Sequence, residues 1–191
     1  MKNPYRTDRE IERLADETRK NAYKAGVECE FPFHAENTVE FLFNYRLKLG
    51  EEMPIGTLGY TDFENRIVGI SNNSYNDGSH RFTVAHEIGH IVMHAEVVQA
   101  EQKLKSLFDR PLGPVQNQQM ETQANKFAAA LLMPAAEMIL RFEPLLERNG
   151  YVDARDVAQM FGVSVQSAEL RLGVLNLVVP RNQRELFGWN D

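Results

Sequence analysis

Two histidines, His86 and His90, stand four residues apart in the segment HEIGH. Apolar and small side chains recur at helical intervals through the surrounding residues 81–95. Side chains four residues apart lie on one face of a helix, so both imidazoles can reach a single metal ion. The pattern therefore requires a helix here and predicts a metal site on one of its faces.

Glu87, directly after the first histidine, predicts hydrolytic chemistry at this site. Two imidazoles and one carboxylate suit zinc and leave a fourth position for water. A glutamate beside the first ligand can reach that water and act as a general base. The alternative interpretation is structural: two histidines on a surface helix whose ring nitrogens are satisfied by hydrogen bonds.

The third protein ligand is expected from a neighbouring helix, and Glu121 is the strongest candidate. It lies near the start of a predicted helix over residues 118–133, which is rich in alanine and leucine. Asn125, four residues on, shares its face and is expected to orient a ligand side chain by a hydrogen bond. A glutamate in the first turn of a helix also interacts favourably with the helix dipole, which is the structural alternative for Glu121.

Glu96 and Glu101 are weaker ligand candidates, because nothing around them resembles a ligand-bearing helix. His94 continues the four-residue spacing of the two earlier histidines. Each further step of four drifts around the helix, so the three rings cannot all point equally well at one ion. We therefore expect His94 to be a flanking or core histidine.

Two segments resemble the signatures of the ImmA/IrrE family of bacterial and phage zinc metallopeptidases. RFTVAHEIGH (residues 81–90) is similar to the active-site helix of that family, and ETQANKFAAALLMP (residues 121–134) to its second signature. The resemblance implies that Glu121, which opens the second signature, binds the metal with the two histidines. Gln123 stands where the family often has a second acidic residue, and it is not expected to be a ligand.

The resemblance also implies a function. The expected substrate of this protein is a protein partner, namely a transcriptional repressor or antitoxin encoded by a mobile element or stress regulon. Cleavage of that partner would release gene expression. Zinc held by His86, His90 and Glu121 would activate water and polarise the scissile carbonyl, with Glu87 as the general base. The strand predicted over residues 66–71 would lie along the cleft, where an extended substrate can pair with its edge.

The remaining pattern predicts an α+β fold with a small antiparallel sheet and a C-terminal helical pair, and the resemblance implies that its core is zincin-like. Helices are expected over residues 8–25, with Thr7 or Asp8 as N-cap, and over residues 37–49, with Asn37 and Glu40 as a capping box. Strands over 57–61 and 66–71 flank a turn. An oxyanion-stabilising donor is also expected, but nothing in the sequence selects among His80, Tyr75 and His94.

Residues 153–175 predict a helix, a turn at Gly162 and a second helix capped by Ser164, as in a helix-turn-helix. We predict a metallopeptidase domain over residues 1–150 and a helix-turn-helix-like subdomain over 151–191 packed on it. Residues 151–191 contain four arginines and five acidic residues, so no basic surplus is available for phosphate contacts. Direct nucleic-acid binding is therefore not expected. The alternative function is a non-proteolytic regulatory module that binds a repressor or DNA through these helices.

Composition bears on which partners and which cellular location are expected. The formal net charge of -6 gives no overall basic field that would attract nucleic acid or anionic lipid. No apolar stretch reaches the about 20 residues that a membrane-spanning helix needs. Cys29 is the single cysteine, which excludes an internal disulfide. A cytoplasmic protein without a membrane segment is expected.

Overall fold

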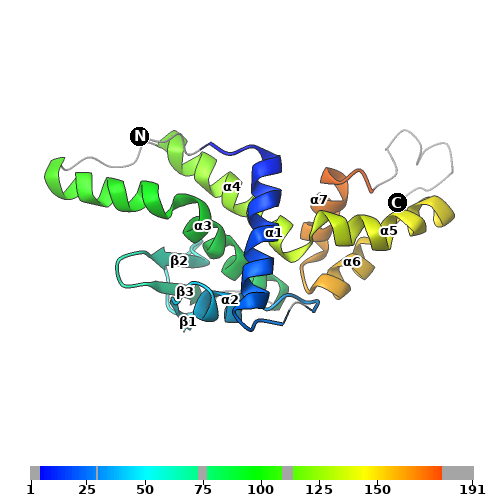
Figure 1. Cartoon of the computed structure of the whole chain (residues 1–191), viewed down its shortest axis with the longest axis horizontal. Helices are drawn as coiled ribbons and strands as arrows, with labels where there is room; N and C mark the ends of the chain where they lie inside the picture. The colour runs from blue at the N-terminus through cyan, green and yellow to red at the C-terminus, as the bar shows by residue number, and fades with distance from the viewer. Residues whose placement is uncertain (1–4, 29, 73–76, 109–113, 178–191) are drawn as a thin grey trace.

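The computed structural model describes residues 5–28, 30–72, 77–108 and 114–177, without the side chains of residues 77, 101–108 and 114–117. Cys29 and Tyr75 lie outside the described residues. Figure 1 shows α3, α4 and the sheet on one side of α1, and α5, α6 and α7 on the other. In chain order the elements are α1 (Asp8–Lys24), α2 (Ala35–Phe41), β1 (Arg46–Glu51), β2 (Gly59–Asp62), β3 (Ile67–Ser71), α3 (Asp77–Phe108), α4 (Pro114–Leu132), α5 (Ala135–Asn149), α6 (Ala154–Phe161) and α7 (Val165–Val174).

Helix α1 begins with a capping box, and the predicted helix over residues 8–25 is confirmed. The Thr7 hydroxyl accepts a hydrogen bond from the Glu10 N–H at 3.3 Å, and Glu10 Oε2 accepts one from the Thr7 N–H at 2.8 Å. Two N–H groups that the helix leaves unpaired are thereby satisfied. The buried face consists of Ile11, Ala15, Thr18 and Ala22.

The helix predicted over residues 37–49 is wrong in extent and in its start. Helix α2 ends at Phe41, and Asn44 takes a left-handed backbone conformation, with φ 55°. Asparagine tolerates this conformation better than most residues. The apolar positions that fit a helical period instead lead into β1, whose backbone pairs with β3, so pairing with a distant strand overrides the local pattern. No side-chain cap is present, because His34 is the N-cap and Asn37 lies inside α2.

The sheet has the strand order β1-β3-β2. Strands β2 and β3 are antiparallel, as predicted, whereas β1 runs parallel to β3, so the expectation of a purely antiparallel sheet is wrong. Strand β3 is therefore the central strand, and its residues 68–71 are buried. A central strand has no free edge, and the expectation that a substrate pairs with the edge of residues 66–71 is wrong as well.

Helices α3 and α4 pack closely at Gly89. A Cβ atom at Gly89 would lie 3.2 Å from Ala124 Cα and 3.2 Å from Phe127 Cδ1, so glycine permits the approach of the two backbones. Helix α3 extends well beyond the predicted residues 81–95 at its C-terminal end. Because Gly89 lies between His86 and His90 in the sequence, this contact also determines how near both histidines come to α4.

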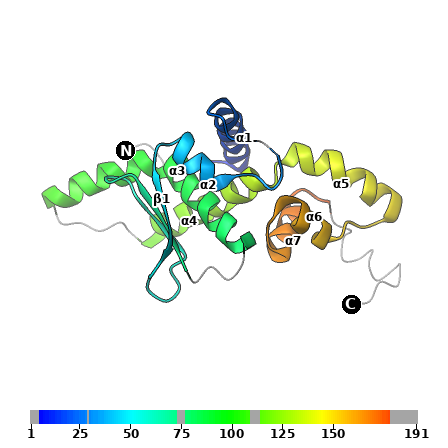
Figure 2. The same cartoon turned by 90° about the horizontal axis from the view of Figure 1, so that it is seen from below.

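Helices α6 and α7 are separated by a turn at Gly162, as the sequence predicts. The Ser164 side chain accepts a hydrogen bond from the Ser167 N–H at 3.1 Å and caps α7. The buried Arg171 side chain joins α7 to the rest of the molecule, since Nε donates to the Met133 carbonyl at 2.9 Å and Nη2 to Glu12 Oε2 at 3.0 Å. In both views the sheet and these two helices lie on opposite sides of α1 (Figure 1, Figure 2). None of the described helices combines the length and apolar character that crossing a membrane requires.

Candidate metal centre

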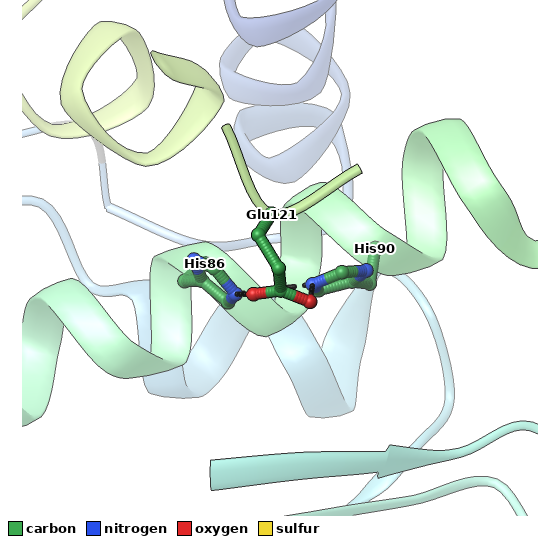
Figure 3. Close-up of side chains that lie close together, drawn as sticks. All are labelled: His86, His90 and Glu121. Atoms are coloured by element: carbon green, nitrogen blue, oxygen red, sulfur yellow. Dashed lines mark hydrogen bonds and ion pairs between the residues drawn. The ribbon is translucent and has the colours of Figure 1, made fainter. Parts of the chain in front are cut away.

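Three side chains from two helices converge at one point (Figure 3). His86 and His90 project from α3, and their Nε2 atoms are 3.0 Å apart. Glu121 of α4 places Oε2 3.1 Å from His86 Nε2 and Oε1 3.4 Å from His90 Nε2. One ligand atom from each of the three lies within 4.8 Å of the others. The structure therefore brings together the two predicted histidines and the predicted third ligand.

The chemistry of this donor set fits a bound cation. Asn125 Oδ1 lies 2.9 Å from His86 Nδ1 and can only accept, so the hydrogen bond holds the proton on Nδ1 and leaves the Nε2 lone pair facing the cluster. Lone pairs of two imidazoles and a carboxylate at such distances repel one another unless a proton or a cation lies between them. The two nitrogens and one carboxylate also match the ligands that zinc prefers.

The pKa shifts of the cluster also indicate a site that favours positive charge. Where a proton takes the place of the metal ion, hydrogen bonds from the His86 and His90 rings hold the pKa of Glu121 well below its usual range. Burial alone would lower the pKa of His86, but Glu121 and Glu87 outweigh it and raise that pKa. The site thus stabilises a cation next to an ionised carboxylate.

Glu87 lies beside this cluster in a buried position between α3 and β2. The Thr61 hydroxyl donates a hydrogen bond to Glu87 Oε2 at 2.6 Å. Burial raises the pKa of Glu87, although the Thr61 hydroxyl opposes the shift. A Cβ atom at Gly59 would lie 2.9 Å from Glu87 Oε1 and 2.8 Å from Thr83 Cγ2, so a larger residue here would force these side chains to shift. Thr61 and Gly59 are site residues that the sequence did not predict.

A cavity of about 580 Å³ runs between β2 and the two ligand helices. Its lining includes the three convergent residues, Glu87, Asn125 and residues 56–61. Strand β2, not β3, therefore lies along this cleft. It pairs with β3 on one side and is an edge strand of the sheet. We name this cavity the metal cleft.

His94 lies behind the cluster and does not belong to it. Its ring is fully buried, and its Nδ1 is 3.1 Å from His90 Nδ1. Burial lowers the pKa of His94 to about 3, so the ring is neutral. His94 is thus a flanking histidine that contacts the far side of His90, and it does not line the metal cleft.

The other candidates lie elsewhere. His80 faces α2, with Nδ1 3.3 Å from Glu36 Oε1, and does not line the metal cleft as an oxyanion donor would. Gln123 is buried and accepts a hydrogen bond from the Arg6 N–H at 3.2 Å. Glu96 is exposed on α3 and outside the cluster. The Glu101 side chain lies outside the described residues.

Two imidazoles and two carboxylates thus lie on one wall of the metal cleft. Metallopeptidases use sites of this composition. Residues 27–173 match the IrrE N-terminal-like domain of peptidase family M78. The chain therefore belongs to the ImmA/IrrE family of metallopeptidases. Membership implies a bound metal ion, for which His86, His90 and Glu121 form a suitable group.

Two individual proteins are similar to parts of this chain. The radiation response metalloprotease IrrE of Deinococcus radiodurans is 38% identical over 96 residues, which are 48% of this chain and 28% of that protein. A Mycobacterium tuberculosis transcriptional regulator has a similar fold, with a TM-score of 0.58 and 15% identity over 83% of this chain and 46% of the other. The chain thus spans less than half the length of either protein.

Proposed function

We propose that this protein is a zinc-dependent endopeptidase that cleaves a protein partner in the cytoplasm, a transcriptional repressor or antitoxin with a DNA-binding domain. The observation that carries the proposal is the convergence of His86, His90 and Glu121 on the wall that also holds Glu87. Family membership supports the peptidase activity. The choice of substrate rests on the family resemblance alone.

In this proposal His86, His90 and Glu121 hold the metal, and Asn125 orients His86. A zinc ion bound there would acidify a water molecule and polarise the scissile carbonyl. Glu87 takes the proton of the attacking water and passes it to the leaving amine. The raised pKa of Glu87 suits this role, because a carboxylate that is a stronger base accepts the proton more readily.

Strand β2 supplies the surface along which the substrate binds. Its free edge borders the metal cleft, and an extended peptide can add to such an edge through main-chain hydrogen bonds. Gly59 and Thr61 face Glu87, so a peptide on this edge lies next to the general base. The proposed core is zincin-like, with a domain over residues 1–150 and a helix-turn-helix-like subdomain over 151–191.

The alternative is a non-proteolytic module that acts through α6 and α7. Arg171 is the only basic residue of α7, and it is buried against Glu12 and the Met133 carbonyl. The helix that would enter a DNA groove therefore presents no cation for phosphate contacts. This observation favours the peptidase and disfavours direct DNA binding.

Zinc-loaded wild type and Glu87→Gln are incubated with a candidate repressor, and fragments are measured by mass spectrometry. Glutamine keeps the size of Glu87 and can still accept the Thr61 hydrogen bond. We expect equal zinc contents and cleavage slower by about 10²–10⁴-fold in the variant. Equal loss of repressor DNA binding with both proteins and without fragments would instead establish the non-proteolytic module.

A further inference from the structure

A second cavity of about 520 Å³ lies between α1, α4 and α7. Its apolar lining comes from all three helices and from Phe82 of α3: Ile11 and Ala129 from α1 and α4, and Leu170 and Val174 from α7. We name this cavity the α1–α7 groove. Its volume falls within the range of about 300–1,000 Å³ that is common for ligand sites.

The α1–α7 groove continues from the metal cleft. Phe82 and Asn125 line both cavities, and Asn125 also bonds His86 Nδ1 at 2.9 Å. An extended polypeptide advances about 3.3 Å per residue. A chain in the metal cleft therefore reaches the α1–α7 groove within a few residues of the point where the proposed ligands meet.

The charges around the α1–α7 groove are already paired. Lys126 Nζ lies 2.6 Å from Asp8 Oδ1, and Arg171 binds Glu12 with both terminal nitrogens. These four residues are the charged members of the described lining, so neither sign is left in excess. A charged occupant would gain no partner here, whereas an uncharged apolar side chain is accommodated.

The wall of the groove on α7 combines two aliphatic side chains, Leu170 and Val174, with the polar Gln166, Ser167 and Arg171. Leu170 and Val174, four residues apart on one helical face, are each 68% exposed. Two large aliphatic side chains beside an apolar cavity are a surface on which another apolar group would remove water contact.

We propose that the α1–α7 groove is a specificity subsite, which binds one large apolar side chain of the protein substrate a few residues from the scissile bond. The proposal rests on the proposed peptidase function and adds a selection rule to it. In this account α7 helps to recognise the substrate, and Leu170 and Val174 determine which side chain is accepted.

The test compares wild type, Leu170→Asp, Leu170→Lys and the control Leu140→Asp on a mixture of peptides from a digested proteome. Leu140 is 71% exposed on α5 and lines neither cavity. We expect wild type and Leu140→Asp to share a preference for large apolar residues at one position near the cleaved bond. Leu170→Asp should lose that preference by about tenfold and favour Lys or Arg there, and Leu170→Lys should favour Asp or Glu.

A binding measurement separates this proposal from the proposed function. Glu87→Gln, with or without Leu170→Asp, is immobilised and exposed to the same peptides. Capture that depends on Leu170, without cleavage by wild type, supports the groove and overturns the peptidase. Cleavage with an identical profile in all variants overturns the groove alone, and neither capture nor cleavage overturns both.

Discussion

The two helix pairs α3–α4 and α6–α7 are built from the same kind of element and differ in what they place between the helices. Between α3 and α4 polar side chains face one another: His86, His90, Glu121 and Asn125. Helices α6 and α7 bury apolar side chains against the core, including Phe161, Ala168 and Leu172. The chemistry therefore belongs to the first pair, and the second offers a surface.

The way each pair is fixed differs too. Helices α3 and α4 are held by close backbone contact at Gly89. Helix α7 is tied to α1 and to the end of α4 by Arg171. If the pairs have separate roles, changes in the α3–α4 pair should alter metal binding, and changes in the α6–α7 pair should leave the metal affinity of the folded protein unaltered.

The largest expected effect is that of Glu121→Ala on metal binding. Loss of one of three proposed ligands should weaken zinc affinity by about 100-fold or more, because even outer partners of ligands contribute about 10–100-fold. Competition with a zinc-binding dye measures the affinity. Glu169→Ala, an exposed glutamate of α7, is the matched control and should leave it unchanged. Equal affinities of the two variants would remove Glu121 from the site.

Arg171→Ala should destabilise the fold and spare the metal. The substitution leaves Glu12 and the Met133 carbonyl without their partner, at a cost of about 2–4 kcal/mol in the free energy of unfolding. Urea unfolding measures this cost, and the double variant Arg171→Met with Glu12→Leu should recover most of it. We expect the bound zinc to fall only as far as the fraction of folded protein falls. Loss of zinc from protein that remains folded would contradict separate roles for the two pairs.

The buried ring of His94, on α3, should make the free energy of unfolding depend on pH. The ring has a pKa of 6.5 when exposed and about 3 in the folded protein, because of its burial. The unfolded chain thus binds a proton between these values that the folded chain does not, so stability falls as the pH falls below about 6.5. At about pH 5 the loss is about 2 kcal/mol. Metal-free wild type should lose this much more than His94→Leu in urea unfolding between about pH 7.5 and 5; equal losses would show that the buried ring is protonated.

The smallest expected effect is on stability, where substitution of two glycines by alanine should have opposite signs. Gly89→Ala puts a methyl group 3.2 Å from the Ala124 backbone and should destabilise by about 1 kcal/mol and weaken zinc binding. Gly173→Ala on α7 meets nothing within 4 Å and should stabilise by up to about 1 kcal/mol, because alanine favours the helix. Thermal unfolding of both variants gives the comparison. Stabilisation by both would mean that the α3–α4 contact is not tight.

Local spacing was enough to predict α1 and the helices of both pairs. The four-residue interval of His86 and His90 and the caps Thr7 and Ser164 depend on neighbours in the sequence, and the structure has these helices. Strand β1 was missed because Leu47 also fits the helical period of the apolar residues before it, and only pairing with β3 distinguishes the two structures. Thr61 and Gly59 were missed for the same reason, since their contact with Glu87 spans residues far apart in the chain.

The central claim is that His86, His90 and Glu121 share one metal ion. Anomalous diffraction from zinc-loaded crystals at the zinc absorption edge tests it directly. The account predicts one peak at about 2.0–2.2 Å from an Nε2 atom of each histidine and a carboxylate oxygen of Glu121. A peak held by other side chains, or an ordered cluster without any peak after zinc loading, would contradict it.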